Sequence, residues 1–329
     1  MRPVTSISFW GSHAQRFVES HASARVVAVF SRSLHLQREG DFACIGDPSI
    51  GRGPLNAVLE LEGWMRLAAA PTPVGMGVSI AQGVIRLGNV ALDATRGQCW
   101  RPKPRPTARC KAALQALQRL QRLAAEQAPA DGLARTVLGL AGARLSALER
   151  LAPPRVERLR AWMTARRLRP VGTPPPVDLL GLGPGLTPSG DDVLCGMLVA
   201  LHAVGWTELA RDLDAEIAKA APSATSPISA AFLRAAAEGL ACEALHEAIC
   251  AVLEGQTEAL AGHVAALARI GHTSGWDALV GAVLVLQAFV TMQGPRPGGG
   301  IYPAPDPSLG IGYFADPRDK PEGRREIPA

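Results

Sequence analysis

The hydrophobic pattern of this chain changes period at a basic, proline-rich segment, Arg101–Pro106. Before it, from Arg25 to about Asp93, apolar residues alternate with polar ones or form short runs, which is typical of strands. After it, from Arg109 onward, apolar residues recur every three or four positions, which is typical of amphipathic helices. Closely spaced prolines continue neither element. We therefore expect an α+β fold, with an antiparallel β-rich N-terminal domain followed by a mainly α-helical domain.

Turn residues support the division into a β-rich and a helical domain. Gln82-Gly83 and Gly88-Asn89 separate three short apolar runs, so they predict a meander of two tight hairpins between about Met76 and Asp93. Strands with such short connections favour an antiparallel sheet or small barrel over a βαβ unit. We expect a β-rich domain over residues 1–100, a helical domain over 101–292, and a Pro/Gly-rich, disordered tail over 293–329.

Composition narrows the functional classes. Hydrophobic residues make up 47% of the 329 and charged residues only 19%, which excludes a globally disordered chain. The net charge of +5 is the only argument for nucleic-acid binding, and few aromatic residues accompany it, so we expect no nucleic acid. The longest apolar stretch, Ala278–Val290, is shorter than the roughly 20 residues that cross a bilayer, so we expect no membrane span.

The six cysteines form no C-x-x-C pair, and several lie within apolar runs. The N-terminus has no apolar segment of signal-peptide length. Both observations favour a cytoplasmic protein. Neither a zinc-protease pattern nor a G-x-S-x-G elbow is present: His246-Glu247 with Cys250 lacks a second histidine, and Ser189 has no identifiable base.

The most informative motif is GLGPGLTPSGDD at residues 181–192, directly before an apolar helix expected over Val193–Val204. Glycines let a backbone approach a ligand, and a helix start supplies unpaired N–H groups with a partial positive charge. We expect the backbone amides of Gly183, Gly185 and Gly190 to form a cradle for an anion such as phosphate. The lysine of a Walker loop is absent, which disfavours a nucleotide triphosphatase.

The acidic end of this motif has two interpretations. Ser189 with Asp192 forms an S-x-x-D pattern, which would cap the helix without any ligand. That capping pattern does not account for Asp191 or Thr187. Asp191 and Asp192 are therefore both candidate catalytic residues. Asp191 and Asp192 are also candidate Mg²⁺ ligands, because Mg²⁺ often takes one or two carboxylates and completes its shell with water and phosphate.

A second copy of the motif begins at Gly271, as GHTSGWDALVG. Seven positions are identical once Pro188 is skipped, and they pair as Gly185/Gly271, Thr187/Thr273, Ser189/Ser274, Gly190/Gly275, Asp192/Asp277, Leu194/Leu279 and Gly196/Gly281. Each copy opens an unusually apolar helix. We infer a pseudo-symmetric helix pair whose N-termini converge on one site. The alternative is that both copies are merely capped core helices.

This arrangement defines the candidate site residues. Catalytic candidates are Asp191, Asp192 and His272, the one histidine within a motif. Substrate-binding candidates provide amides, hydroxyls or a carboxylate, and they are Gly183, Gly185, Thr187, Ser189, Gly190, Thr273, Ser274, Gly275 and Asp277.

Three segments, in this order, resemble the signature blocks of the AllH-type family: GLGPGLTPSGDDVLCG, TSPISAAFLRAAAEG at Thr225–Gly239, and GHTSGWDALVG. GPLNAVL at Gly53–Leu59 is a weaker match to an N-terminal block. One member type of the family is a subunit of oxamate carbamoyltransferase. The resemblance covers most of residues 20–292.

The resemblance implies a multi-subunit transferase of ureide catabolism. Such an enzyme phosphorolyses an N-carbamoyl acid such as oxalurate to carbamoyl phosphate and an amide or amine, and a carbamate kinase then makes ATP. FdrA-like and AllG-type subunits are the implied partners. Two alternatives stay open: a non-catalytic metabolite-binding or scaffold subunit of such a complex, and a nucleic-acid-binding protein that only the net charge supports.

Overall fold

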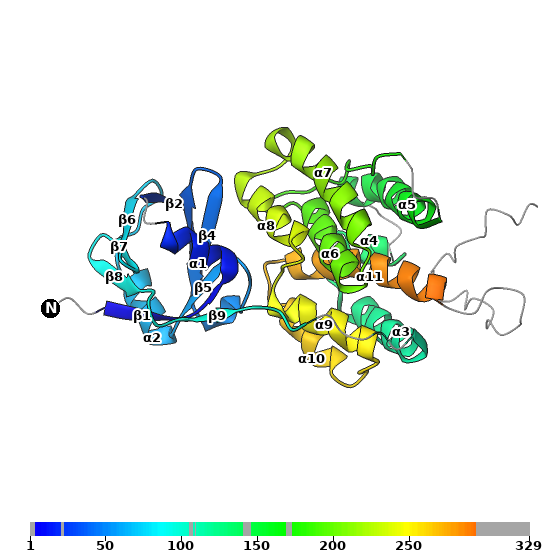
Figure 1. The fold of residues 1–329 in the computed structure, drawn as a ribbon, viewed down its shortest axis with the longest axis horizontal. Helices are drawn as coiled ribbons and strands as arrows, with labels where there is room; N and C mark the ends of the chain where they lie inside the picture. Colours follow the sequence, from blue (N-terminus) through cyan, green and yellow to red (C-terminus); the bar gives the residue numbers. More distant parts are fainter. Residues whose placement is uncertain are drawn as a thin grey trace, which may run out of the picture.

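Strands and helices occupy separate halves of the molecule. The structure, a computed structural model, describes residues 4–20, 23–104, 108, 110–140, 146–168 and 173–293. In Figure 1 the strands gather on the left and the long helices on the right, joined by the segment that leads from β9 to α3. The expected α+β fold is confirmed. The tail expected over 293–329 lies, beyond Gln293, outside the described residues.

Nine strands build the β-rich part. Their bounds are β1 Val4–Gly11, β2 Ala24–Val29, β3 Ser33–Arg38, β4 Asp41–Gly46, β5 Asn56–Leu59, β6 Gly77–Ala81, β7 Val84–Leu87, β8 Val90–Asp93 and β9 Gln98–Trp100. They follow the order β5-β4-β3-β2-β6-β7-β8-β1-β9, and an additional pairing of β5 with β1 closes the first eight into a barrel. In that closing pair Ile7 lies opposite Leu59.

The sheet is mostly antiparallel, as expected, but three of its pairings are parallel: β1 with β8 and β4 with β5 within the barrel, and β1 with the additional strand β9. Two of them involve β1, which precedes the region where the period-two pattern predicted strands. Strand β1 is part of the barrel wall, and β8 pairs with it although many residues separate the two strands in sequence. The parallel direction of this pair therefore depends on closure of the barrel and not on a local turn.

The expected meander is present. Gln82 and Gly83 both have positive φ, 50° and 73°, and they join β6 to β7. Two consecutive residues of this kind make the tight turn that matches the right-handed twist of paired strands. Gly88 (φ 55°) turns β7 into β8, and Glu39 (φ 50°) turns β3 into β4.

Alternating strand residues fill the barrel with side chains such as Ile7, Leu34, Leu36, Ile45 and Leu87, all at most 1% exposed. Two short helices, α1 (Ser12–Glu19) and α2 (Leu61–Ala68), add Phe17 and Trp64 to the same core.

Helices α3 to α11 make up the other half: α3 Cys110–Gln127, α4 Ala134–Val137, α5 Ala147–Leu168, α6 Ser189–Ala203, α7 Thr207–Ala224, α8 Pro227–Ala237, α9 Glu243–Glu254, α10 Leu260–Leu267 and α11 Ser274–Gln293. The periodicity of Leu133–Leu151 predicts one helix, but α4 ends after one turn. Gly139 has φ 74° and Leu140 N–H bonds to Arg135 O, which together close the helix.

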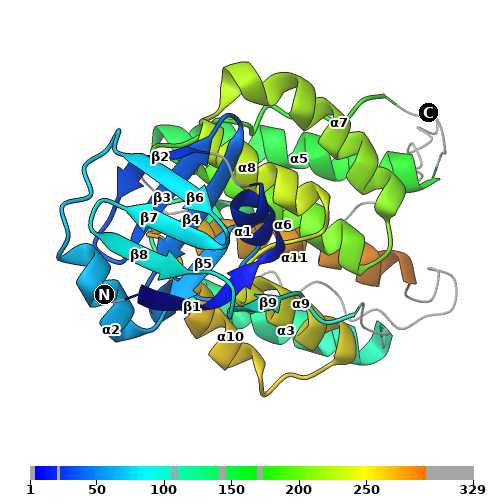
Figure 2. The ribbon, with the colours of Figure 1, turned by 60° about the vertical axis from the view of Figure 1, so that its left-hand side comes forward.

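Helices α6 and α11 form the centre of this half, where most of their residues are buried. In Figure 2 the other helices surround them. Helix α11 is long and apolar enough to cross a membrane, but 83% of its most apolar window is buried inside the protein. It is therefore a core helix.

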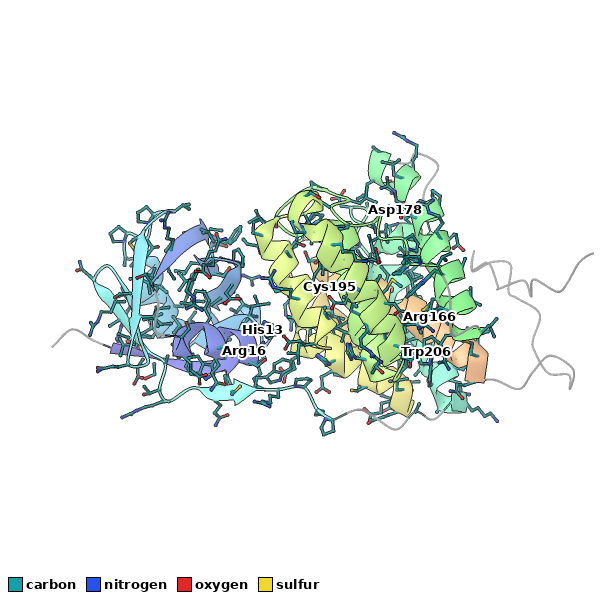
Figure 3. The ribbon with its side chains drawn as sticks, turned by 45° about the horizontal axis from the view of Figure 1, so that its top comes forward. His13, Arg16, Arg166, Asp178, Cys195 and Trp206 are labelled. Atoms are coloured by element: carbon teal, nitrogen blue, oxygen red, sulfur yellow. The ribbon has the colours of Figure 1, made fainter. Side chains whose placement is uncertain are left out.

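The barrel and the helices share a smaller apolar cluster. Phe42 and Leu55 from the barrel pack with Ile228, Ala231 and Ala235 of α8. Ion pairs surround this cluster at the junction, including Arg52 with Glu243 of α9 at 3.0 Å and Arg16 of α1 with Glu238 at 3.2 Å. Figure 3 places His13 and Arg16 of α1 at this junction.

Candidate functional site

The first turns of α6 and α11 lie side by side. Thr187 Oγ1 is 3.0 Å from Ser274 Oγ, so the loop before α6 is hydrogen-bonded to the start of α11. Each helix also reaches the acid of the other: the Ser274 hydroxyl bonds to Asp192, and the Ser189 hydroxyl bonds to Asp277. The two copies of the sequence motif therefore meet in a reciprocal arrangement, as the repeat predicts.

One turn later the two helices touch through their backbones. A Cβ added to Gly196 would overlap the carbonyl oxygen of Ala278, and one added to Gly281 would overlap that of Val193. The contacts at the first turn and at the second turn join equivalent positions of α6 and α11. The two helices therefore run in the same direction, with their N-termini adjacent. Glycine at Gly196 and Gly281 is what permits this approach.

The expected amide cradle is only partly available. Gly190 N–H donates to Leu182 O at 2.8 Å, and Gly275 N–H donates to Ile270 O at 3.1 Å. A Cβ at Gly190 would overlap Leu179 O, and one at Gly275 would overlap Leu267 O. These two glycines thus let the preceding loop pack against each helix, and their amides are already engaged.

The expected capping pattern is wrong. Helix α6 begins at Ser189 itself, Pro188 occupies the N-cap position, and no side chain caps the helix. Ser189 is thereby the first helical residue, and its hydroxyl reaches Asp277 of the other helix instead.

The alignment of the two copies also needs correction. Gly183 (φ 122°) lies against the N and Cβ of Ser189, and Gly271 (φ 61°) lies against the same atoms of Ser274. Gly183 is therefore the structural counterpart of Gly271, whereas the sequence pairing assigned Gly185. A Cβ at Gly185 would meet nothing within 4 Å. The loop of the first copy is longer, and skipping Pro188 alone does not account for the extra residues.

Asp191 links the segments around the site through hydrogen bonds. It is fully buried, and its carboxylate accepts hydrogen bonds from Gly181 N (2.6 Å), Ser229 Oγ (2.5 Å) and Thr225 Oγ1. It ties the glycine loop and the start of α8 to α6. Both of its oxygens therefore have hydrogen-bond partners within the chain.

Asp192 and Asp277 are different, since each keeps a buried oxygen, Oδ2, with no hydrogen-bond partner among the described residues. Their side chains belong to residues that are 9% and 0% exposed. Burial raises the pKa of Asp192 well above its ordinary value, and the charges of Asp277 and Asp191 raise it further, against the Ser274 hydroxyl. Burial likewise raises the pKa of Asp277 to about 6, although the N–H of Leu133 lowers it.

The candidate hydroxyl side chains differ in how deeply they are buried. Ser189 is buried beside the acids, whereas Thr187, Thr273 and Ser274 are only half-buried. The site thus has an inner pair of carboxyl groups and an outer layer of hydroxyl groups.

His272 does not join this site. Its side chain is 79% exposed, and Nε2 lies 3.0 Å from Asp131 Oδ2, which is 75% exposed. Although His272 is adjacent to Thr273 in sequence, it lies on the surface.

Sequence reasoning missed three supporting groups. Thr225 and Ser229, which hold Asp191, lie within the second signature block, so that block was the available signal. Leu133 N–H donates to Asp277 Oδ1 at 2.6 Å, and Gly132 packs against the same carboxyl group. No pattern in the sequence indicates this contact, because a backbone donor carries no side-chain signature.

The neighbouring thiols are not activated. Burial raises the pKa of Cys195 well above its ordinary value and that of Cys242 to about 11. Both thiols therefore stay protonated near neutral pH. Figure 3 shows Cys195 within the helical half. Within the described ranges, no group of three or more His, Cys, Asp or Glu is arranged to hold a metal ion.

A family comparison covers this site. Residues 179–286 match the family described as oxamate carbamoyltransferase subunit AllH. The matched segment, about a third of the chain, contains both copies of the motif and the α8 block, so the resemblance drawn from the motifs is confirmed. The candidate site lies within this matched segment. The family is described as a subunit of oxamate carbamoyltransferase. No solved structure matches the chain significantly.

Proposed function

We propose that this chain is a subunit of a carbamoyltransferase of the oxamate carbamoyltransferase type and that it holds the carbamoyl donor at the N-termini of α6 and α11. One observation carries the proposal: the three signature blocks are linked at one place. Thr187 of the first bonds to Ser274 of the third, and Asp191 of the first bonds to Thr225 and Ser229 of the second.

The proposed reaction is phosphorolysis of an N-carbamoyl acid such as oxalurate. A phosphate oxygen forms a bond to the carbamoyl carbon, the bond from that carbon to the acyl-bearing nitrogen breaks, and the leaving nitrogen takes up a proton. The products are carbamoyl phosphate and the amide or amine.

The outer hydroxyl groups suit the anionic part of the reactants. Thr187, Thr273 and Ser274 lie at two adjacent helix starts, and each start stabilises a nearby negative charge by about 0.3–1 kcal/mol. In this proposal a phosphate or the carboxylate of the N-carbamoyl acid binds at these hydroxyls. The carbamoyl group lies deeper, toward the buried acids.

We further propose that turnover requires FdrA-like and AllG-type partner subunits. The described site contains hydroxyls, two perturbed carboxyl groups and protonated thiols, but no nucleophile with an adjacent base that would activate it. Such a site can hold and polarise a reactant. The remaining catalytic groups then come from another subunit.

The test combines binding and turnover. Phosphate or carbamoyl phosphate should stabilise the isolated chain against heat, by about 2.7 kcal/mol at a hundredfold excess over Kd. Carbamoyl phosphate should form from oxalurate only when the partner subunits are added. The double variant Thr187→Val/Ser274→Ala should lose both effects, whereas the surface variant Ser223→Ala on α7 should keep them.

A scaffold subunit is the second candidate, and the internal use of Asp191 and of the Gly190 and Gly275 amides favours it. In that case the double variant would assemble with the partners and turn over at the wild-type rate, and no phosphate-bearing ligand would shift the melting temperature. Phosphorolysis by the purified single chain would contradict the division of labour instead.

A further inference from the structure

A hollow of about 360 Å³ lies in the helical half, where α6 turns into α7. Two arginines at the end of α5, the Gly205-Trp206 turn and the first turn of α7 line it. Gly205 has φ 78°, and Trp206 N–H donates to Leu201 O at 2.8 Å, so α6 ends in a tight turn and α7 starts directly after it. Figure 3 shows Arg166 and Trp206 in the helical half, on the side away from the barrel.

This hollow is separate from the candidate site. It lies at the C-terminal end of α6, whereas Ser189 and Asp192 belong to the first turn of that helix. At 1.5 Å per residue, the 15 residues of α6 place the two about 20 Å apart. A small ligand in the hollow therefore does not contact the residues of the proposed carbamoyl site.

A buried aromatic ring holds Arg167 at the hollow. Trp206 is 5% exposed, and its ring centroid lies 5.9 Å from that of Phe289 on α11. The guanidinium carbon of Arg167 lies 4.8 Å from the centroid of the Trp206 ring, within the range of a cation–π contact. A guanidinium group stacked by its face keeps its N–H groups at its edge, where they can donate to an anion.

The two arginines of the hollow differ in their partners. Arg166 Nε lies 2.7 Å from Asp212 Oδ2, and its Nη2 lies 3.9 Å from Glu208 Oε2, so acids of α7 compensate its charge. Within the part of the chain that the structure describes, Arg167 forms no ion pair with an acid, and its contact is the Trp206 ring. The hollow thus presents one guanidinium charge that no acid compensates.

The first turn of α7 adds backbone donors to the same wall. Helix α7 has 18 residues, its N-cap is Trp206, and no side chain caps it. The first N–H groups of a helix, here those of Thr207, Glu208 and Leu209, have no carbonyl within the helix to bond to. All three residues line the hollow, and Thr207 contributes a hydroxyl group. A guanidinium group, backbone N–H groups and a hydroxyl group are together a donor set suited to phosphoryl oxygens.

We propose that the hollow binds the phosphoryl group of a small phosphomonoester, with Arg167 as the charged contact and the first turn of α7 as the backbone contact. The hollow is larger than a free phosphate ion, and its volume lies within the roughly 300–1,000 Å³ of small-molecule pockets. Glu208 is 68% exposed and opposes the anion, so it limits the affinity. This binding does not depend on the proposed function.

The first experiment excludes the carbamoyl site from the measurement. The full chain with Thr187→Val/Ser274→Ala is titrated by calorimetry with AMP, adenosine and inorganic phosphate. AMP should bind at one site, at least about tenfold more tightly than adenosine, which lacks the phosphoryl group. Inorganic phosphate should bind more weakly than AMP, since it fills less of the hollow. Equal affinities for AMP and adenosine, no binding of either, or phosphate binding as tight as that of AMP would overturn the proposal.

The second experiment uses charge variants in the same background, for which the expected effects have opposite signs. Arg167→Gln should weaken AMP binding at least about tenfold, whereas Glu208→Gln should strengthen it about threefold, because it removes the opposing charge. Arg122→Gln, at an exposed arginine of α3, is the matched control and should leave the affinity unchanged. Equal losses in Arg167→Gln and Arg122→Gln would mean attraction by net charge alone and would contradict the site.

Fluorescence tests where the ligand binds, because Trp206 is one of six tryptophans in the chain. AMP should change the fluorescence of the Thr187→Val/Ser274→Ala chain. The change should be absent once Trp206→Phe is added, although calorimetry should still detect AMP binding. A fluorescence change that persists in Trp206→Phe would place the ligand elsewhere and overturn the inference.

Turnover separates this inference from the proposed function. Arg167→Gln in the otherwise wild-type chain should leave oxalurate turnover by the complex unchanged. If Thr187→Val/Ser274→Ala binds AMP but turns over at the wild-type rate, the proposed function fails and this inference stands. If that variant loses turnover and does not bind AMP, this inference fails and the proposed function stands.

Discussion

At the scale of single residues, three neighbouring acids have three different surroundings. Asp191 has hydrogen-bond partners at both oxygens, while Asp192 and Asp277 each have a free one. Chemical type is the same in all three, so the difference comes from the donors that the fold brings near each carboxyl group. This difference separates an acid with partners at both oxygens from two acids that each keep an unpartnered oxygen.

Asp191→Asn should lower the free energy of unfolding by about 1–3 kcal/mol, because the amide replaces one acceptor with a donor that faces the Thr225 and Ser229 hydroxyls. Urea denaturation measures the change. Asp178→Asn, which loses a half-exposed acid with surface ion pairs to Arg155 and Arg158, is the control and should change stability by less than about 1 kcal/mol. An Asp191→Asn protein as stable as wild type, but unable to bind ligand, would restore a direct role for Asp191.

The buried acids should also make stability depend on pH. Asp277 has a raised pKa in the folded chain, about 6 against an ordinary 3.8, so the folded state binds its proton more tightly than the unfolded state does. This contribution is complete at low pH and is lost as pH rises through that interval. From about pH 4 to pH 7, Asp277→Asn should gain roughly 2–2.5 kcal/mol of stability relative to wild type.

Urea denaturation of both proteins across this pH range measures that difference. Acids that do not interact with Asp277 titrate equally in both proteins, so they cancel, whereas Asp192, whose pKa the charge of Asp277 raises, adds to the difference. A constant difference between wild type and Asp277→Asn would mean that Asp277 is not a proton-binding group of the folded site.

At the scale of elements, the site depends on how closely α6 approaches α11. The glycines at 196 and 281 remove the side chains that would separate the two backbones. The Thr187 to Ser274 hydrogen bond and both acid contacts lie one turn away, at the same end of the helix pair. Helix packing and site geometry are therefore coupled.

Gly196→Ala should destabilise the chain by about 1–3 kcal/mol, because the new methyl group overlaps the carbonyl of Ala278. It should also weaken ligand binding by moving the two helix starts apart. Gly262→Ala on α10 is the matched control, since a Cβ there meets nothing within 4 Å, and it should be neutral or stabilising by up to about 1 kcal/mol. Thermal denaturation compares the two variants. Equal melting temperatures for Gly196→Ala and Gly262→Ala would contradict the close approach of α6 to α11.

At the scale of the whole molecule, the barrel is attached to the helix that anchors Asp191. The start of α8 supplies Thr225 and Ser229 to Asp191, and the same helix packs against Phe42 and Leu55 of the barrel. The β-rich half can thus affect the site without contributing a side chain to the acid pair.

Ile228→Ala should cost about 2–4 kcal/mol, because it removes a buried side chain from the shared cluster. Hydrogen exchange should become faster in β4 as well as in α8, since both pack on that cluster. Leu61→Ala, at a residue 58% exposed on α2, is the control and should leave exchange in both elements unchanged. Faster exchange confined to α8 would show that the two halves are not energetically coupled.

The sequence by itself determined the features that depend on local interactions along the chain. Period-two and helical patterns predicted the α+β fold, and turn residues predicted the hairpin at Gln82-Gly83. The repeat also predicted that the starts of α6 and α11 meet. These features depend on residues close together in the chain, or on a self-similarity that can be read directly.

Tertiary structure alone decided which of these residues face one another. It closed the barrel through β1, engaged the amides of Gly190 and Gly275, left His272 on the surface and supplied Leu133 N–H to Asp277. Each of these outcomes depends on a backbone group or on a contact between residues far apart in sequence. Residue type does not encode such contacts, because a backbone N–H is the same at nearly every position and only the fold aims it.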